Sequence, residues 1–400
     1  MIYTSLFTFF IIFFIYINKS FYKKLFILFI SLSFSLSFFL DTNFYLENFD
    51  LIIIFFILHC LFFTLMLPNS KIFVINEITI HPFISKIMFL SYINIYFLAY
   101  IIFYTYSQLS ILDITIGEFK NGGIASEVVS NSYVKYLLLI SRVLSPFGYL
   151  ALFILILKLI SNDSKHLFYY LFISFNIPLI HLVAFSRSFV VLYFLFLLFI
   201  FIKYYKCFPP NLRAYLSKRI PYLLILIATI FLSVTYYRFE SMAYWGKFQG
   251  SSYDNVIIFS LIYYFSSWIK VSISILSDFT IPLVGVFHDF LSLPIFIINK
   301  FNYAIDLQTF DYQIYATEFK GLFVSLLFDQ GILFFMSFLI FIILMRIYLF
   351  NVNNIKFELI YSIFAIFMSV SFFFGNLFVY VDFVLAFVYF LFLSKFISVK

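Results

Sequence analysis

Long apolar runs separated by short polar segments dominate the chain from its first residues to its last. A helix needs about 20 predominantly apolar residues to cross the roughly 30 Å hydrocarbon core of a bilayer, and most runs approach that length. Inside a bilayer every backbone amide must be paired within the protein, and the runs lack the alternation of barrel strands, so we predict helices. The runs cover residues 2–17, 25–40, 51–67, 87–106, 134–157, 167–185, 188–202, 221–237, 321–345, 357–374 and 376–394.

This pattern predicts an all-α fold, a polytopic transmembrane bundle of about 11 helices, with a range of about 10 to 13. We expect residues 1–400 to form a single integral membrane domain. Residues 2–17 lack the basic start and small-residue cleavage site of a signal peptide, so we interpret them as a retained helix. The composition agrees, because 64% of the residues are hydrophobic and 11% are charged, whereas soluble domains are about 25% charged.

Basic residues gather in a few connecting segments and orient the predicted bundle, because Lys and Arg favour cytoplasmic loops. The strongest signal is residues 203–219, which hold five basic residues and no acid. The segments after the first, third, fifth and ninth runs and the C-terminus are also basic, so we predict all of them on the inner side. The net charge of +7 therefore reflects membrane orientation, and we expect no nucleic-acid partner.

The remaining connections are acidic or nearly charge-balanced, and we predict them on the outer side. The charged residues in 41–50 are all acidic, and residues 108–132 are polar with little net charge. The longest is 238–320, which we predict to be a large periplasmic loop. Within it, residues 256–276 and 281–298 are either interfacial helices on the outer surface, which we favour, or two further spans.

Three arginines are predicted near the outer face: Arg142 in the fifth run, Arg187 between the sixth and seventh, and Arg238 at the end of the eighth. A guanidinium stays charged, and its planar fork binds phosphate oxygens bidentately, so together they predict a diphosphate site. The alternative is that each one reaches lipid headgroups or caps a helix end. Arg187 is the strongest candidate, because Ser186 and Ser188 flank it within an apolar stretch.

Two further ionisable residues are candidates for chemistry. Asp329 interrupts the ninth run. It either binds an arginine and so sets the geometry of the site or locks two helices together, and we favour this structural role. His288 in the large loop is a candidate general base, because an imidazole pKa of about 6.5 suits proton abstraction, although a passive loop histidine is the alternative. No HExxH or CxxC spacing and no nucleotide-binding glycine motif occurs, so we expect no metal and no cofactor.

In these features the chain resembles the Wzy-type oligosaccharide repeat-unit polymerases, which make O-antigen or capsular polysaccharide. An SR dipeptide opens an apolar helix, a long outer loop precedes the ninth run, and a late segment matches T-x-F…D-x-G. The matching residues are Ser186, Arg187, Thr317, Phe319, Asp329 and Gly331. The chain departs from the family in lacking a second Gly soon after D-x-G, and in a span count that places the N-terminus outside.

The resemblance implies a glycosyltransferase in the bacterial inner membrane that polymerises undecaprenyl diphosphate-linked oligosaccharides at the periplasmic face. The three arginines would bind the diphosphate and stabilise its developing charge, and His288 or Glu318 would take the acceptor proton. A chain-length regulator protein and the lipid bilayer are the implied partners. The alternatives are a lipid-linked oligosaccharide flippase, an O-antigen ligase that joins polymer to lipopolysaccharide core, and a membrane O-acyltransferase. A flippase would favour two similar halves and many Gly hinges, and the chain holds ten Gly and no evident halves.

Overall fold

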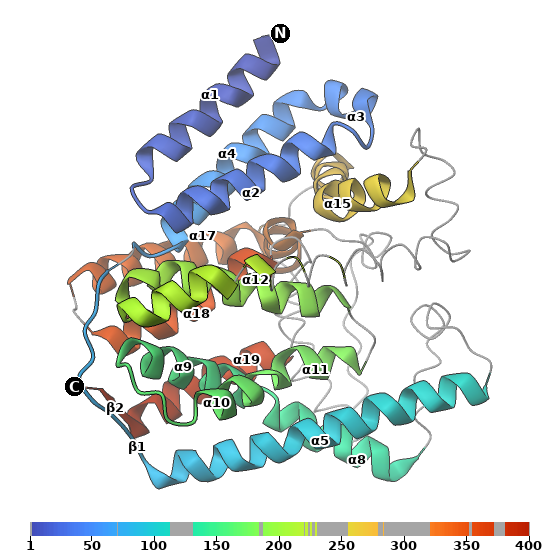
Figure 1. Ribbon diagram of the computed structural model, residues 1–400. Helices are drawn as coiled ribbons and strands as arrows, with labels where there is room; N and C mark the ends of the chain where they lie inside the picture. The colour runs from blue at the N-terminus through green and yellow to red at the C-terminus, as the bar shows by residue number, and fades with distance from the viewer. Residues whose placement is uncertain are drawn as a thin grey trace. The chain divides into compact units, whose positions relative to one another are not determined.

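The computed structural model describes residues 2–69, 71–112, 131–183, 187–219, 255–278, 321–351, 354–371 and 381–399, with a few single positions between 221 and 283. The described residues are mostly helical (Figure 1). They form two compact units, each built from two separate stretches of the chain. Unit 1 holds Met1–Ser70 and Ile225–Val379, and unit 2 holds Lys71–Leu224 and Tyr380–Lys400.

Unit 1 begins with the first three predicted runs, which form helices at nearly the expected bounds. Its helices are α1 (Ile2–Ile17), α2 (Phe21–Ser37), α3 (Thr42–Glu47), α4 (Phe49–Met66), α15 (Val256–Asp278), α17 (Gly321–Asn351) and α18 (Ile355–Ser371). The predicted run 221–237 lies outside the described residues, apart from a few single helical positions.

Unit 2 combines helices with a small sheet. Its helices are α5 (Pro82–Ile111), α8 (Ser132–Leu144), α9 (Phe147–Ile160), α10 (Leu167–Ser174), α11 (Asn176–Leu182), α12 (Arg187–Tyr204) and α19 (Val381–Leu393), with the 3-10 turns η1 (Tyr205–Cys207) and η4 (Ser394–Phe396). Its strands are β1 (Ile78–Ile80) and β2 (Ile397–Val399).

Several of these helices are long and apolar enough to cross a membrane. Among the described residues, four meet both criteria, and two shorter helices are also apolar. The long ones are Phe49–Met66, Pro82–Ile111, Ser132–Ile160 and Gly331–Tyr348, and the short ones are Ser5–Ile17 and Leu167–Leu182. The chain is therefore a helical membrane protein, whereas the total of about 11 spans stays a prediction.

Two runs that we predict as continuous helices are interrupted in the structure. The fifth run is α8 and α9, separated at Ser145 and Pro146, and the sixth is α10 and α11, separated at Phe175. Proline lacks a backbone N–H and crowds the residue before it, so a helix often ends or bends there. Pro178 follows Phe175 in the first turn of α11, where the missing N–H costs nothing.

The strands β1 and β2 pair antiparallel and join two segments that are far apart in the sequence, a feature that the sequence did not predict. Ile78 pairs with Val399 and Ile80 with Ile397, and the His81 N–H donates to the Phe396 carbonyl at 3.1 Å. Both segments belong to regions that we predict on the inner side. Their pairing requires that they lie on the same side of the membrane.

In unit 1, cationic and polar side chains from distant helices cap the carboxyl end of α4. Lys23 Nζ and Arg346 Nη1 donate to the Thr64 carbonyl oxygen at 3.2 and 2.5 Å, and Tyr361 Oη donates to that of Met66 at 2.7 Å. The last four carbonyls of a helix lack partners within it and carry partial negative charge, so cations are favoured there. Lys23 and Arg346 are both predicted on the inner side, and both contact this one helix end.

The helix α15 packs on α2 within unit 1. Its Trp268 is fully buried, with ring centroids 5.8 Å from Phe34 and 5.5 Å from His59. Lys270 Nζ lies 2.6 Å from Asp41 Oδ2, which anchors the helix to the segment before α3. The structure thus shows a helix over the first of the two segments that we predict within residues 238–320, and the assignment of the whole loop to the periplasm stays a prediction.

Candidate functional site

The predicted site residues divide between the two units and the undescribed parts of the chain. Arg142 lies exposed in the last turn of α8. Arg187 is the first residue of α12, and Asp329 lies in α17; the side chains of both are outside the described part of the structure. The other predicted site residues, Arg238, His288 and Glu318, lie outside the described residues altogether.

Arg142 and Arg187 belong to unit 2, and a hydrophobic cluster links the helix of Arg142 to the end of α11, which precedes Arg187 in the chain. Val183, four residues before Arg187, packs with Leu137 of α8, and Leu98, Ile101 and Val134 complete this cluster. Leu137 precedes Arg142 by less than two helical turns. The carboxyl end of α11, four residues before Arg187, therefore packs in the same cluster as the helix that carries Arg142.

The basic segments of unit 2 gather at the other end of these helices. The Cys207 thiol, in the segment that follows α12, lies 3.4 Å from the Lys71 carbonyl oxygen and accepts from the Phe73 N–H at 3.5 Å. This contact places the basic segment 203–219 beside the chain that leads into β1, which pairs with the C-terminus. Because α12 holds 18 residues, Arg187 lies about 25 Å from this basic end.

Asp329 precedes the one position with a positive φ within the described helices of unit 1. Gly331 has φ 81° and ψ 168°, which ends the first part of α17 and starts the apolar stretch Gly331–Tyr348. A side chain at this φ would be strained, so glycine is required for the bend. The bend leaves the Leu333 N–H outside the helical pattern, and it donates to the Leu283 carbonyl at 3.1 Å.

A buried hydrogen-bond network, the asparagine network, lies where the two interrupted spans of unit 2 meet α5. It consists of Ser91, Asn94, Ser141, Ser145 and Asn176, each at most 1% exposed. Asn94 Nδ2 donates to Asn176 Oδ1 at 2.8 Å, and Asn176 Nδ2 donates to the Ser91 carbonyl oxygen at 2.8 Å. Ser145 Oγ donates to the Ser141 carbonyl oxygen at 2.7 Å.

The asparagine network is absent from the site that the sequence predicts. The available signal was an uncharged polar residue inside an apolar run with a proline close behind it, as in Ser145-Pro146 and Asn176-Ile177-Pro178. Polar side chains within spans bond to other helices and are candidate functional positions. The network lies near the middle of its helices, since Ser145 is close to the centre of the 29-residue Ser132–Ile160 span.

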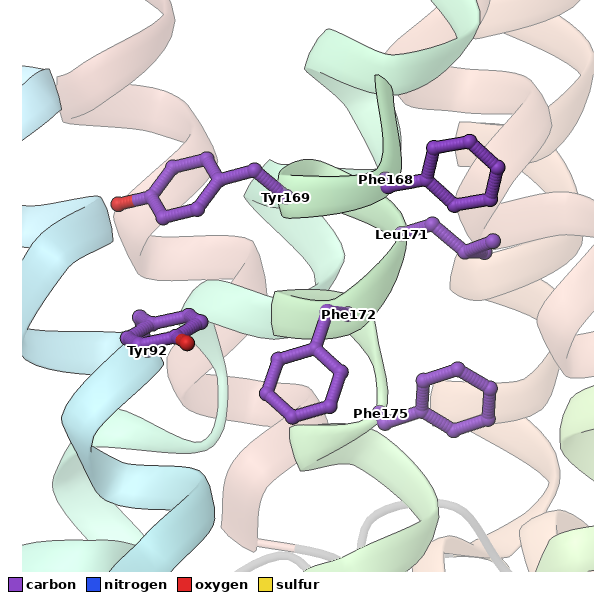
Figure 2. A pocket seen from close by; sticks show the side chains of 6 residues that line it. All are labelled: Tyr92, Phe168, Tyr169, Leu171, Phe172 and Phe175. Atoms are coloured by element: carbon purple, nitrogen blue, oxygen red, sulfur yellow. The ribbon is translucent and has the colours of Figure 1, made fainter. Parts of the chain in front are cut away.

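An open groove of about 490 Å³ lies between α5 and α10, and aromatic rings form most of its wall. Figure 2 shows Tyr92 of α5 facing Tyr169 and Phe172 of α10, with ring centroids 5.6 and 5.4 Å away. The groove is lined by Tyr92, Phe168, Tyr169, Leu171, Phe172 and Phe175. It holds no charged side chain, so it suits hydrocarbon and not a diphosphate.

In each unit, an ion pair lowers the pKa of one aspartate outside the apolar spans. Lys158 at the end of α9 donates to Asp163 Oδ2 at 2.5 Å, and this hydrogen bond holds the pKa of Asp163 below its usual range. Lys270 does the same to the pKa of Asp41. Among the described residues, no group of three or more His, Cys, Asp or Glu side chains is placed to hold a metal ion.

The four long apolar helices among the described residues indicate a polytopic helical membrane protein. No family model matches the chain, and no curated protein and no solved structure matches it either.

Proposed function

We propose that this protein polymerises undecaprenyl diphosphate-linked oligosaccharide repeat units at the outer face of the bacterial inner membrane. The acceptor hydroxyl of one unit attacks the anomeric carbon of the growing chain. The bond from that carbon to the diphosphate breaks, and undecaprenyl diphosphate leaves with the electron pair. The hydroxyl proton passes to His288 or Glu318, and the bilayer and a chain-length regulator are the expected partners.

The observation that carries this proposal is the hydrophobic cluster that links α8, the helix of Arg142, to Val183, four residues before Arg187, within one unit. Arg187 lies at the end of α12 opposite the basic segment 203–219. Two guanidinium groups that reach the same site can engage the two phosphates of one diphosphate. Basic segments favour the inner side, so this position supports an outer-face site.

The position of Arg187 adds a second attraction for phosphate. Arg187 is the first residue of α12, and the dipole of a helix favours anions at its N-terminal end. Stabilising the charge that develops on the leaving diphosphate lowers the barrier of the transfer step. Arg142 lies instead in the last turn of α8, where a cation also offsets the carbonyl end of the helix. Arg187 is therefore the better candidate of the two for binding the diphosphate.

A flippase for the same lipid-linked oligosaccharide is the second candidate function. The observation that favours it is the asparagine network, where two proline-interrupted apolar spans meet near their middles. Interrupted spans with polar groups at mid-membrane often form the substrate or ion site of a transporter.

The deciding experiment is complementation of cells that lack this gene, with the surface polysaccharide separated by length on a gel. Wild type is expected to restore a ladder of lengths, and Arg187→Ala to leave a single repeat unit. Arg187→Lys keeps the charge but loses the bidentate fork, so it should give a sparse ladder of short chains. Membrane levels of each variant, measured with a C-terminal tag, control for loss of the protein.

The outcome also separates the two candidates. A polymerase defect leaves single repeat units on the outer face, whereas a flippase defect traps lipid-linked units on the inner face, inaccessible to an external glycosidase. An unchanged ladder in the gene-deleted cells would end the polymerase proposal.

A further inference from the structure

Two buried polar atoms in the asparagine network have no hydrogen-bond partner among the residues that the structure describes. They are the amide oxygen Oδ1 of Asn94 and the hydroxyl oxygen Oγ of Ser141. Both side chains are 0% exposed. The two residues are neighbours, because Asn94 Nδ2 lies 3.4 Å from the Ser141 carbonyl oxygen.

The orientation of the Asn94 amide is fixed by Asn176. Asn176 Nδ2 donates to the carbonyl oxygens of Ser91 and Ile173, both at 2.8 Å, and a carbonyl can only accept. Asn176 must therefore turn its Oδ1 toward Asn94, and the Asn94 group that meets it must be the donor, Nδ2. Exchanging the two Asn94 atoms would set one acceptor against another. The Asn94 oxygen consequently points away from Asn176.

The two unpartnered atoms differ in their hydrogen-bonding roles. Asn94 Oδ1 only accepts hydrogen bonds, whereas the Ser141 hydroxyl has a proton to donate. A cation would bind both oxygens but accept no proton, so the Ser141 hydroxyl would need a separate acceptor. A water molecule donates one proton to Asn94 and accepts the proton of Ser141. Ser145 Oγ, which lies 3.4 Å from Asn94 Nδ2, offers an acceptor for the second proton of that water.

We propose that Asn94 and Ser141 bind one internal water molecule in the middle of unit 2. This water links α5 to the α8–α9 span next to its interruption at Pro146. Buried waters of this kind bond to about three otherwise unpaired polar groups and are part of the folded structure. Lipid supplies no hydrogen bonds at this depth, so the bound water replaces partners that bulk solvent would give elsewhere.

The test is the thermal unfolding midpoint of the purified full-length protein in detergent, for wild type and Ser141→Ala. With the water present, Ser141→Ala removes one of its partners, and we expect the midpoint to fall by about 2–4 °C. Without it, the substitution only deletes an unpaired buried hydroxyl, so the midpoint would stay or rise and overturn the proposal. Ser33→Ala is the matched control, because Ser33 Oγ on α2 is also fully buried and has no partner among the described residues. An equal fall in both variants would likewise overturn the proposal.

Two further measurements sharpen the result. In a double-mutant cycle, Ser141→Ala should lower the midpoint less in an Asn94→Ala background than in wild type, because the shared water is already lost. Additive effects would contradict a shared water, and if Asn94→Ala does not fold, the comparison with Ser33→Ala decides. A midpoint that depends on sodium, potassium or choline in wild type but not in Ser141→Ala would assign the site to a cation and overturn the water. Equal midpoints in the three salts support the water.

Discussion

Asn94 on α5 donates a hydrogen bond of 2.8 Å to Oδ1 of Asn176, which is the first residue of α11. The two residues are 82 positions apart in the chain. Their contact joins a continuous span to an interrupted one at the level of the interruption, where Asn176 also bonds to Ser91 and Ile173. One side chain thereby satisfies backbone carbonyls on two helices.

Asn176→Ala is expected to destabilise the protein by about 2–4 kcal/mol, because it removes the shortest hydrogen bond of the buried Asn94 amide and the Asn176 bonds to Ser91 and Ile173. The thermal unfolding midpoint in detergent measures the change. Asn211→Ala, at an exposed asparagine outside the network, is the control and should change stability by less than about 0.5 kcal/mol. Equal behaviour of the two variants would show that the network contributes no stability.

Gly148→Ala is expected to destabilise by about 1–3 kcal/mol through overpacking. A Cβ at this position would lie 2.9 Å from Ile177 Cγ1 and 3.3 Å from the Ser174 carbonyl oxygen. Unfolding midpoints of Gly148→Ala, Ile177→Ala and the double variant check the cause. If the clash with Ile177 is responsible, Gly148→Ala costs less when Ile177 is already alanine. Additive costs would point to the backbone carbonyl instead.

Cys207 is expected to react with a membrane-impermeant maleimide in inverted vesicles and not in intact cells. It lies beside Lys71 and shares an end of unit 2 with the C-terminal strand, in a region whose basic residues favour the inner side. Cys60 is fully buried in α4 and should not react. Cys207→Ser serves as the control and should abolish the labelling. Labelling of intact cells would reverse the predicted orientation of unit 2.

Asp41→Asn is expected to lower stability slightly at neutral pH and to have no effect in acid. The Lys270 hydrogen bond, with a smaller contribution from the Phe44 N–H, lowers the pKa of Asp41 in the folded protein. The stabilisation is therefore complete above the unfolded pKa of about 3.9 and is lost as the pH falls through the lower, folded pKa. Both side chains are more than a third exposed, so the gain is below about 1 kcal/mol.

Unfolding midpoints of wild type and Asp41→Asn across pH 3–7 check this expectation. Asparagine also accepts hydrogen bonds as an N-cap, so the substitution removes the charge and keeps the cap of α3. The two curves should converge at the acid end. A difference that persists there would trace the effect to the cap and not to the ion pair.

The apolar runs predicted most of the described helices, because helix formation in a membrane span depends on residues that are close together in the sequence. A backbone surrounded by lipid must pair its own N–H and C=O groups, and a long apolar run leaves the helix as the solution. The helix α1 has the predicted bounds, and α4 begins two residues before the predicted run and ends one residue before it does. The sequence also singled out Gly331, where the structure shows a bend that only glycine accommodates without strain. Of the predicted site, Arg142 and Arg187 lie in the same unit, whereas Arg238, His288 and Glu318 fall outside the described residues.

The sequence by itself determined that this is a helical membrane protein, since composition and run length depend only on neighbouring residues. The tertiary structure alone decided the pairing of Ile78 with Val399, the bond from Asn94 to Asn176 and the contact of Lys270 with Asp41. An uncharged polar residue in an apolar run has no periodicity that identifies its partner. These partners are chosen only when packing brings distant helices close enough for a buried polar group to be satisfied.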